Sequence, residues 1–167
     1  MPTRILIDGR SGSGKTEFAS ALSAATPGSQ LVRLDDIYPG WGGLEAASTA
    51  VHTHVLSEFR WQRFDWTTHS LAEWHTLDPT RPIIVEGCGA LSAANRALAT
   101  LGFWVDLDDV TRKRRALTRD GDTYVPHWDE WATQEVAFIR REDPRNHADV
   151  VIDGADVTAE LTRWLTP

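Results

Sequence analysis

The chain has 167 residues, of which 17 are Lys or Arg and 24 are Asp or Glu, so its formal net charge is −7. This length is typical of one domain, and 41% hydrophobic residues suffice for a sizeable core. The acidic balance argues against a nucleic-acid binder, and the apolar runs are too short for a membrane span. A single cysteine, Cys88, excludes a disulfide framework and a cysteine-based zinc site. We therefore expect one cytoplasmic domain over residues 1–167, without a signal peptide, a nucleic-acid partner or a membrane partner.

Apolar runs alternate with helical patterns along the chain, which predicts an α/β fold with a parallel sheet. The expected strands cover 4–8, 31–34, 82–86, 101–106 and 148–153. The expected helices cover 15–25, 44–59, 92–99, 108–120, 127–142 and 156–165. The turn signal Asp120-Gly121 should end the helix that begins at 108.

The first strand and helix enclose a complete phosphate-binding motif. The pattern G-x-x-x-x-G-K-[ST] is matched by Gly9, Arg10, Ser11, Gly12, Ser13, Gly14, Lys15 and Thr16. The glycines allow a tight turn whose N–H groups point at phosphate oxygens, and the helix N-terminus favours the same anion. Lys15 would contact the β- and γ-phosphates, and the Thr16 hydroxyl would bind Mg²⁺. A Rossmann dinucleotide site is excluded because its third glycine would fall at Glu17.

Acidic residues follow the neighbouring strands. Asp35 and Asp36 come after the second strand, and Glu86 ends the third. Ligands of open α/β sheets bind at the carboxyl ends of the strands, so these groups would surround the phosphate site. The GTPase patterns D-x-x-G and N-K-x-D are both absent. This layout is typical of phosphoryl transfer to a small hydroxyl compound, although each carboxylate could instead belong to a solvated loop or cap a turn.

At these residues the chain resembles the uridine kinase-like family of P-loop nucleoside and nucleotide kinases. The similar segments are Ile7–Thr16, the D-x-F-Y-like stretch Asp35–Tyr38, the stretch Arg63–Trp66, and the arginine-rich stretch Arg112–Asp120. The resemblance extends over about residues 4–153. It implies a three-layer P-loop fold whose five parallel strands lie in the order 2-3-1-4-5.

The resemblance also implies residue roles on the acceptor side. Asp35 would be the catalytic base, and Tyr38 and Trp66 would line the substrate site. Asp65 would hold hydroxyl groups of the acceptor. Trp41, Trp61, Trp66 and Trp74 gather between the second and third strands, where they would either form a wall for a flat ring or simply pack.

On the phosphate side, an arginine-rich lid is expected at about 108–126. Arg112, Arg115 and Arg119 are spaced i, i+3 and i+7 and share one helix face, although a solvated basic surface would show the same pattern. Arg119 would act in catalysis together with Lys15, and Arg115 would help to bind the nucleotide. Mg²⁺ would be held by Thr16, with Glu86 nearby.

The expected function is therefore ATP- and Mg²⁺-dependent phosphorylation of a hydroxyl group on a small molecule, with a nucleoside as the first candidate. The alternatives are a kinase for another small metabolite, or a nucleotide-binding or ATP-hydrolysing protein without an acceptor. The pair Asp35 and Asp65 favours a kinase, since an ATPase needs no carboxylates in an acceptor pocket. The oligomeric state is not predicted.

Overall fold

A computed structural model describes residues 2–166 of the chain. A five-stranded sheet in the order β2-β5-β1-β6-β7 forms its centre, and every neighbouring pair is parallel. The strands are β1 (Arg4–Asp8), β2 (Gln30–Arg33), β5 (Ile83–Glu86), β6 (Leu101–Asp106) and β7 (Val150–Asp153). Counted among themselves, these five strands have the order 2-3-1-4-5, so the predicted topology is confirmed.

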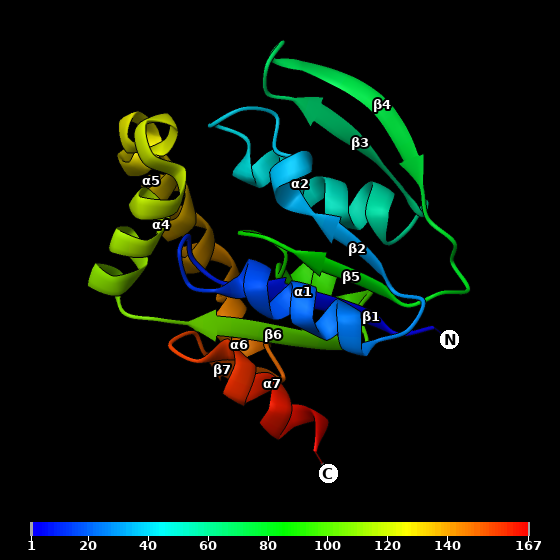
Figure 1. Ribbon diagram of the computed structural model, residues 1–167. Helices are drawn as coiled ribbons and strands as arrows, with labels where there is room; N and C mark the ends of the chain where they lie inside the picture. Colours follow the sequence, from blue (N-terminus) through cyan, green and yellow to red (C-terminus); the bar gives the residue numbers. More distant parts are fainter. Residues whose placement is uncertain (1, 167) are drawn as a thin grey trace.

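Helices cover both faces of the sheet and make the fold three-layered (Figure 1). One face carries α1 (Lys15–Ala25) and α7 (Val157–Leu165), and the other carries α2 (Leu44–Ala50), α3 (Ala93–Ala97), α5 (Trp128–Glu142) and α6 (Pro144–His147). Successive β1 residues point to opposite layers: Ile5 and Ile7 pack with α1, whereas Leu6 packs with α2. Burial on both faces explains why β1 and β5 appear in the sequence as continuous apolar runs.

Two predicted helices differ in detail from the observed ones. The helix expected over 44–59 ends earlier: α2 continues as a π-helical turn over Val51–Val55, and the chain then reverses at Phe59 with φ 55°. The helix expected over 108–120 is α4 (Asp109–Tyr124), followed by a 3₁₀ turn at Val125–His127. Gly121 does interrupt α4, with φ 50° and ψ −133°, but the helix resumes for one further turn beyond it.

An antiparallel hairpin, β3 (Arg60–Asp65) with β4 (Ser70–Thr76), was not predicted. It lies apart from the main sheet, beyond its β2 edge (Figure 1). Only Phe64 is buried in it, so its sequence lacks the apolar pattern of a core strand. A stacked pair across the strands, Trp61 on His75 at 4.2 Å between ring centroids, supports the pairing instead.

The remaining tryptophans follow the prediction in part. Trp104 is buried in the core as expected, whereas Trp164 of α7 is 38% exposed and rests only edge-on against Phe103.

None of the helices within residues 2–166 is long and apolar enough to cross a membrane.

Candidate active site

The phosphate loop joins β1 to α1 and has the backbone of an anion site. Gly12 and Gly14 have φ 78° and φ 101°, in the left-handed region that favours glycine. A side chain at Gly12 is also excluded by space, because its Cβ would lie 2.1 Å from the backbone oxygen of Arg112. Among the described residues, the N–H groups of Gly14, Lys15 and Thr16 donate to no protein acceptor. These free donors at a helix N-terminus fit a phosphate group.

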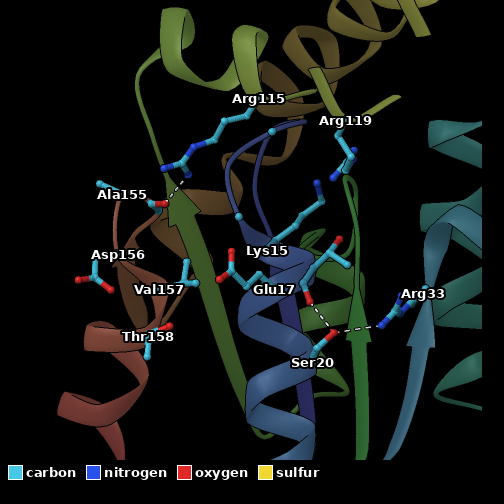
Figure 2. A pocket seen from close by; sticks show the side chains of 14 residues that line it. Lys15, Glu17, Ser20, Arg33, Arg115, Arg119, Ala155, Asp156, Val157 and Thr158 are labelled. Carbon is cyan, nitrogen blue, oxygen red and sulfur yellow. Dashed lines mark hydrogen bonds between the residues drawn. The ribbon is translucent and has the colours of Figure 1, made fainter. Parts of the chain in front are cut away.

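Lys15 extends from the start of α1 into the adjoining cavity (Figure 2). Burial by itself lowers the pKa of this amine. The negative charges of the nearby Glu86, Asp35 and Glu135 carboxylates act against burial, and the pKa lies above its ordinary value. Lys15 therefore stays protonated and presents a fixed positive charge.

Thr16 and Glu86 lie together, as the sequence predicts. The Thr16 hydroxyl donates to Glu86 Oε1 at 3.1 Å. Burial raises the pKa of Glu86, and the nearby charge of Lys15 partly offsets that effect. No group of three or more His, Cys, Asp or Glu side chains with metal-binding spacing occurs within residues 2–166. One hydroxyl beside one carboxylate nevertheless fits Mg²⁺, which takes few protein ligands and retains several waters.

Two cavities open at this edge of the sheet. The first has a volume of about 580 Å³ and lies between the phosphate loop, α4 and the start of α7 (Figure 2). We call it the nucleotide cavity; its walls include Gly12, Gly14, Lys15, Thr16, Arg33, Arg115, Arg119 and the 154–158 segment. Arg115 donates to the backbone oxygen of Gly154 at 2.8 Å, so α4 closes over the α7 side of this space.

The second cavity, the aromatic cavity, has a volume of about 720 Å³. Its ring-bearing walls are Tyr38, Trp41, Trp66, His69, Tyr124, His127 and Trp131, and its other lining residues include Ser11, Asp35, Cys88, Asp120 and Thr123. Trp41 is central: its ring stacks with His127 at 4.4 Å and with Tyr124 at 5.3 Å between centroids. Trp66 meets Trp41 edge-on at 5.2 Å.

The two cavities meet at three shared residues. Lys15, Thr16 and Arg119 line both of them. Lys15 and Thr16 come from the phosphate loop and α1, whereas Arg119 reaches in from α4 (Figure 2). A ligand in the nucleotide cavity and a ligand in the aromatic cavity would therefore meet between Lys15 and Arg119.

Among the residues predicted for the acceptor side, three line the aromatic cavity and one does not. Asp35 lies in the 3₁₀ turn Leu34–Asp36 after β2 and faces the cavity, whereas Asp36 is not part of its lining. Trp66 donates from Nε1 to the backbone oxygen of Asp35 at 2.9 Å, which ties the hairpin to this turn. Tyr38 is buried and donates to the backbone oxygen of Cys88 at 2.8 Å.

Asp65 is the predicted acceptor residue that lies outside the lining. Its carboxylate accepts hydrogen bonds from the N–H groups of Thr67 and Thr68 at 2.9 and 3.3 Å. These bonds lower the pKa of Asp65. The residue thus closes the turn between β3 and β4 in this structure.

The arginines of α4 separate into two kinds. Arg115 and Arg119 reach the nucleotide cavity, and Arg119 forms a two-point ion pair with Asp120 at 2.9 and 2.7 Å. Arg112 was expected on the same face but is 2% exposed and donates to the backbone oxygen of Ser11 at 3.0 Å. Arg112 therefore fastens α4 to the phosphate loop and does not present its charge to either cavity.

Sequence reasoning missed Glu135 of α5. This carboxylate is 3% exposed and accepts hydrogen bonds from Arg10 Nε at 3.0 Å and from the Ser11 N–H at 2.7 Å. The guanidinium of Arg10 is thus bound to the Glu135 carboxylate. A signal existed: Glu135 shares the buried helix face of Trp128, Trp131 and Phe138, where a carboxylate needs a partner.

No family model and no curated protein matches the chain. Solved structures do match. A possible uridine kinase from Bacillus stearothermophilus aligns over 91% of this chain and 89% of its own, with TM-score 0.61 and 18% identity. A shikimate kinase from Bacteroides thetaiotaomicron aligns over 99% of both chains, with TM-score 0.57 and 13% identity. A gluconokinase from Sinorhizobium meliloti 1021 covers 98% and 93%, with TM-score 0.55 and 17% identity.

The fold is that of the P-loop kinases. Because the identities lie below one residue in five, the likeness concerns the fold, as the sequence resemblance predicted, and leaves the acceptor open. The P-loop kinase fold also accounts for the position of both cavities, at the carboxyl ends of the parallel strands.

Proposed function

We propose that this protein transfers the γ-phosphoryl group of ATP to a hydroxyl group of a small molecule held in the aromatic cavity. The observation that carries the proposal is the junction of the two cavities at Lys15, Thr16 and Arg119. A phosphate chain bound on the loop would end at that junction, and an acceptor in the aromatic cavity would begin there. Phosphoryl transfer depends mainly on such positioning and on stabilisation of charge.

Each group at the junction has a part in this reaction. The acceptor oxygen bonds to the γ-phosphorus while the bond from that phosphorus to ADP breaks, and Asp35 accepts the proton of the hydroxyl group. Lys15 and Arg119 stabilise the negative charge on the transferring group and on the leaving phosphates. Mg²⁺, held by Thr16 with Glu86, would neutralise part of the phosphate charge.

A nucleoside is the acceptor that we favour. Stacked and edge-on rings around Trp41 offer flat apolar surfaces, which suit a base, while Asp35 supplies a polar group for hydroxyls. If the acceptor is instead a phosphorylated sugar, a sugar acid or another ring-bearing metabolite, the protein still belongs to the proposed class of small-molecule kinases. ATP hydrolysis without an acceptor is the rival function, and an aromatic cavity opening onto the phosphate loop gives such an enzyme no advantage.

The test is a screen for acceptor-stimulated release of ADP from Mg-ATP. Nucleosides, neutral sugars, sugar acids and hydroxylated heteroaromatic compounds would be supplied one class at a time. We expect one class to stimulate ADP release and the phosphorylated product to appear in equal amount. Lys15→Met is the inactive control. It removes the positive charge that would face the phosphates, and the side chain is not part of the core. ADP release that no acceptor stimulates would contradict the proposal and favour hydrolysis.

A further inference from the structure

Ser11 of the phosphate loop is held at all three of its polar groups. Its N–H donates to Glu135 Oε1 at 2.7 Å, and its backbone oxygen accepts from Arg112 at 3.0 Å. Its hydroxyl accepts a hydrogen bond from the Tyr124 hydroxyl at 2.7 Å. The partners belong to α4 and α5, so these two helices determine the position of this loop residue.

Tyr124 differs from the other two partners because it also belongs to the aromatic cavity. Its ring stacks on Trp41 at 5.3 Å with an angle of 18°, and it packs edge-on against Trp128. The side chain is 5% exposed and its hydrogen bond to Ser11 is buried, so loss of either hydroxyl should cost the energy of one buried hydrogen bond. One residue thus contacts the wall of the aromatic cavity at its ring and the phosphate loop at its hydroxyl.

The backbone near Tyr124 permits a movement of this side chain. Gly121 breaks α4 with a positive φ of 50°, and the space around its Cα is open. Before this break α4 carries Arg115 and Arg119 of the nucleotide cavity, and after it the helix carries Thr123 and Tyr124 of the aromatic cavity. The last turn of α4 is therefore joined to the first part through a kink at a glycine, a place where a helix can change direction.

We infer that Tyr124 is a positioning residue that couples the aromatic cavity to the phosphate loop. An occupant that presses on the Trp41 and Tyr124 rings fixes the Tyr124 hydroxyl on Ser11, and Ser11 in turn fixes the loop around the phosphates. Since coupling between the binding free energies of two sites is reciprocal, a nucleotide on the loop should change the affinity of the aromatic cavity, and we expect this change to alter the surroundings of Trp41. The inference rests on the proposed function only for the identity of the cavity as the acceptor site.

The test uses Mg-ADP as the probe, without an acceptor. No tryptophan lines the nucleotide cavity, so a change in tryptophan fluorescence on Mg-ADP binding would come from elsewhere in the protein. We expect the native chain to show such a change and Trp41→Phe to reduce it. Tyr124→Phe keeps the ring but removes the hydroxyl, and it should abolish the change while weakening Mg-ADP binding about two- to tenfold, as for one buried hydrogen bond.

A double-variant cycle tests whether Tyr124 acts through Ser11. Ser11→Ala should weaken Mg-ADP binding by the same factor, and Ser11→Ala with Tyr124→Phe should bind no more weakly than either single variant. Tyr38→Phe is the matched control, since it removes a buried cavity hydroxyl that donates to Cys88 and not to the loop. Its fluorescence response to Mg-ADP should equal that of the native chain.

The outcomes separate this inference from the proposed function. A full fluorescence change in Tyr124→Phe, no change in the native chain, or additive effects in the double variant would each overturn the coupling alone. Failure of the native chain to bind Mg-ADP would overturn both the coupling and the proposed function. Normal coupling in a protein that phosphorylates no acceptor would overturn only the proposed function.

Discussion

The nucleotide cavity and the aromatic cavity differ in the chemical groups that form them. The nucleotide cavity depends on backbone conformation, on free N–H groups and on the cations of α1 and α4. The aromatic cavity depends on side chains contributed by the 35–41 segment, the hairpin turn, and helices α4 and α5. The difference suggests a division of labour. Changes in the first cavity should affect every acceptor equally. Changes at residues that line only the second cavity should alter acceptor binding and leave nucleotide binding intact, except at Tyr124 and its hydrogen-bond partner Ser11.

The largest effect is expected at Asp35, which lines the aromatic cavity. Asp35→Asn keeps the size of the side chain but cannot accept the proton, so phosphoryl transfer should fall roughly 10²–10⁴-fold. Mg-ATP affinity should hardly change, as calorimetry would verify. The matched control is Asp36→Asn, which alters the neighbouring carboxylate outside the cavity lining. If Asp36→Asn proves the more damaging change, the base has been assigned to the wrong residue.

Arg119 should contribute the next largest effect. Arg119→Ala removes a cation shared by both cavities, and loss of one such contact commonly lowers kcat by about 10²-fold. The KM for the acceptor should change much less, because in the proposed mechanism the guanidinium stabilises the transferring group and does not bind the acceptor. Arg114→Ala on the exposed side of α4 serves as the control. An unchanged kcat in Arg119→Ala would mean that this arginine belongs to a solvated basic surface and takes no part in the transfer.

Glu86, which accepts a hydrogen bond from Thr16, should give the binding of Mg²⁺ a pH dependence. Burial raises the pKa of Glu86, so on acidification this carboxylate is protonated earlier than an ordinary glutamate. The proposed support of this carboxylate for Mg²⁺ would be present above the raised pKa and lost as the pH falls through it. Folding stability should change in the opposite sense, since the folded chain binds this proton more readily than the unfolded chain.

The variant Glu86→Gln tests both pH dependences, that of Mg²⁺ binding and that of folding stability. We expect this variant to bind Mg²⁺ in the presence of ADP about 10- to 100-fold more weakly at neutral pH and to lose the acid-dependent decline. Magnesium titrations and thermal unfolding at several pH values would measure the two effects. A decline on acidification that persists unchanged in Glu86→Gln would place the titrating group elsewhere.

Trp66 should give the smallest effect and the most selective one. Trp66→Leu removes an aromatic wall of the cavity, which should raise the acceptor KM by about two- to tenfold with little change in Mg-ATP affinity. Trp74→Leu alters an exposed tryptophan of the same hairpin that is not part of the lining. Equal effects of the two substitutions would mean that the hairpin matters as a whole and that its ring in the cavity does not.

The same contrast explains what the sequence could predict. The phosphate loop of the nucleotide cavity is local: Gly12, Gly14, Lys15 and Thr16 lie within five consecutive residues, and the motif requires each of these residue types. Thr16 and Glu86 also came together as expected, because the ends of parallel strands meet at one edge of the sheet. The strand order followed from the resemblance to a known family, since periodicity alone does not order strands.

The aromatic cavity could not be predicted in the same way. Trp41 is far in the chain from Tyr124 and His127, and its stacking on them depends on how α4 and α5 cross the carboxyl edge of the sheet. The hairpin packs few apolar side chains, so the apolar pattern does not predict it. The sequence also does not show the turn in which Asp65 accepts the Thr67 N–H, which is why it points to the acceptor instead. Arg112 shares a helical spacing with Arg115, yet tertiary packing buries it against Ser11.

Transfer of a labelled γ-phosphoryl group in a single turnover tests the central claim most directly. The chain would be mixed with a limiting amount of labelled Mg-ATP and the acceptor that stimulates ADP release, and the label would be followed to the acceptor or to free phosphate. The account predicts that the label moves to the acceptor in the native chain and in Asp36→Asn, and that this transfer is 10²–10⁴-fold slower in Asp35→Asn. Label that appears as free phosphate at one rate in all three chains would contradict the account.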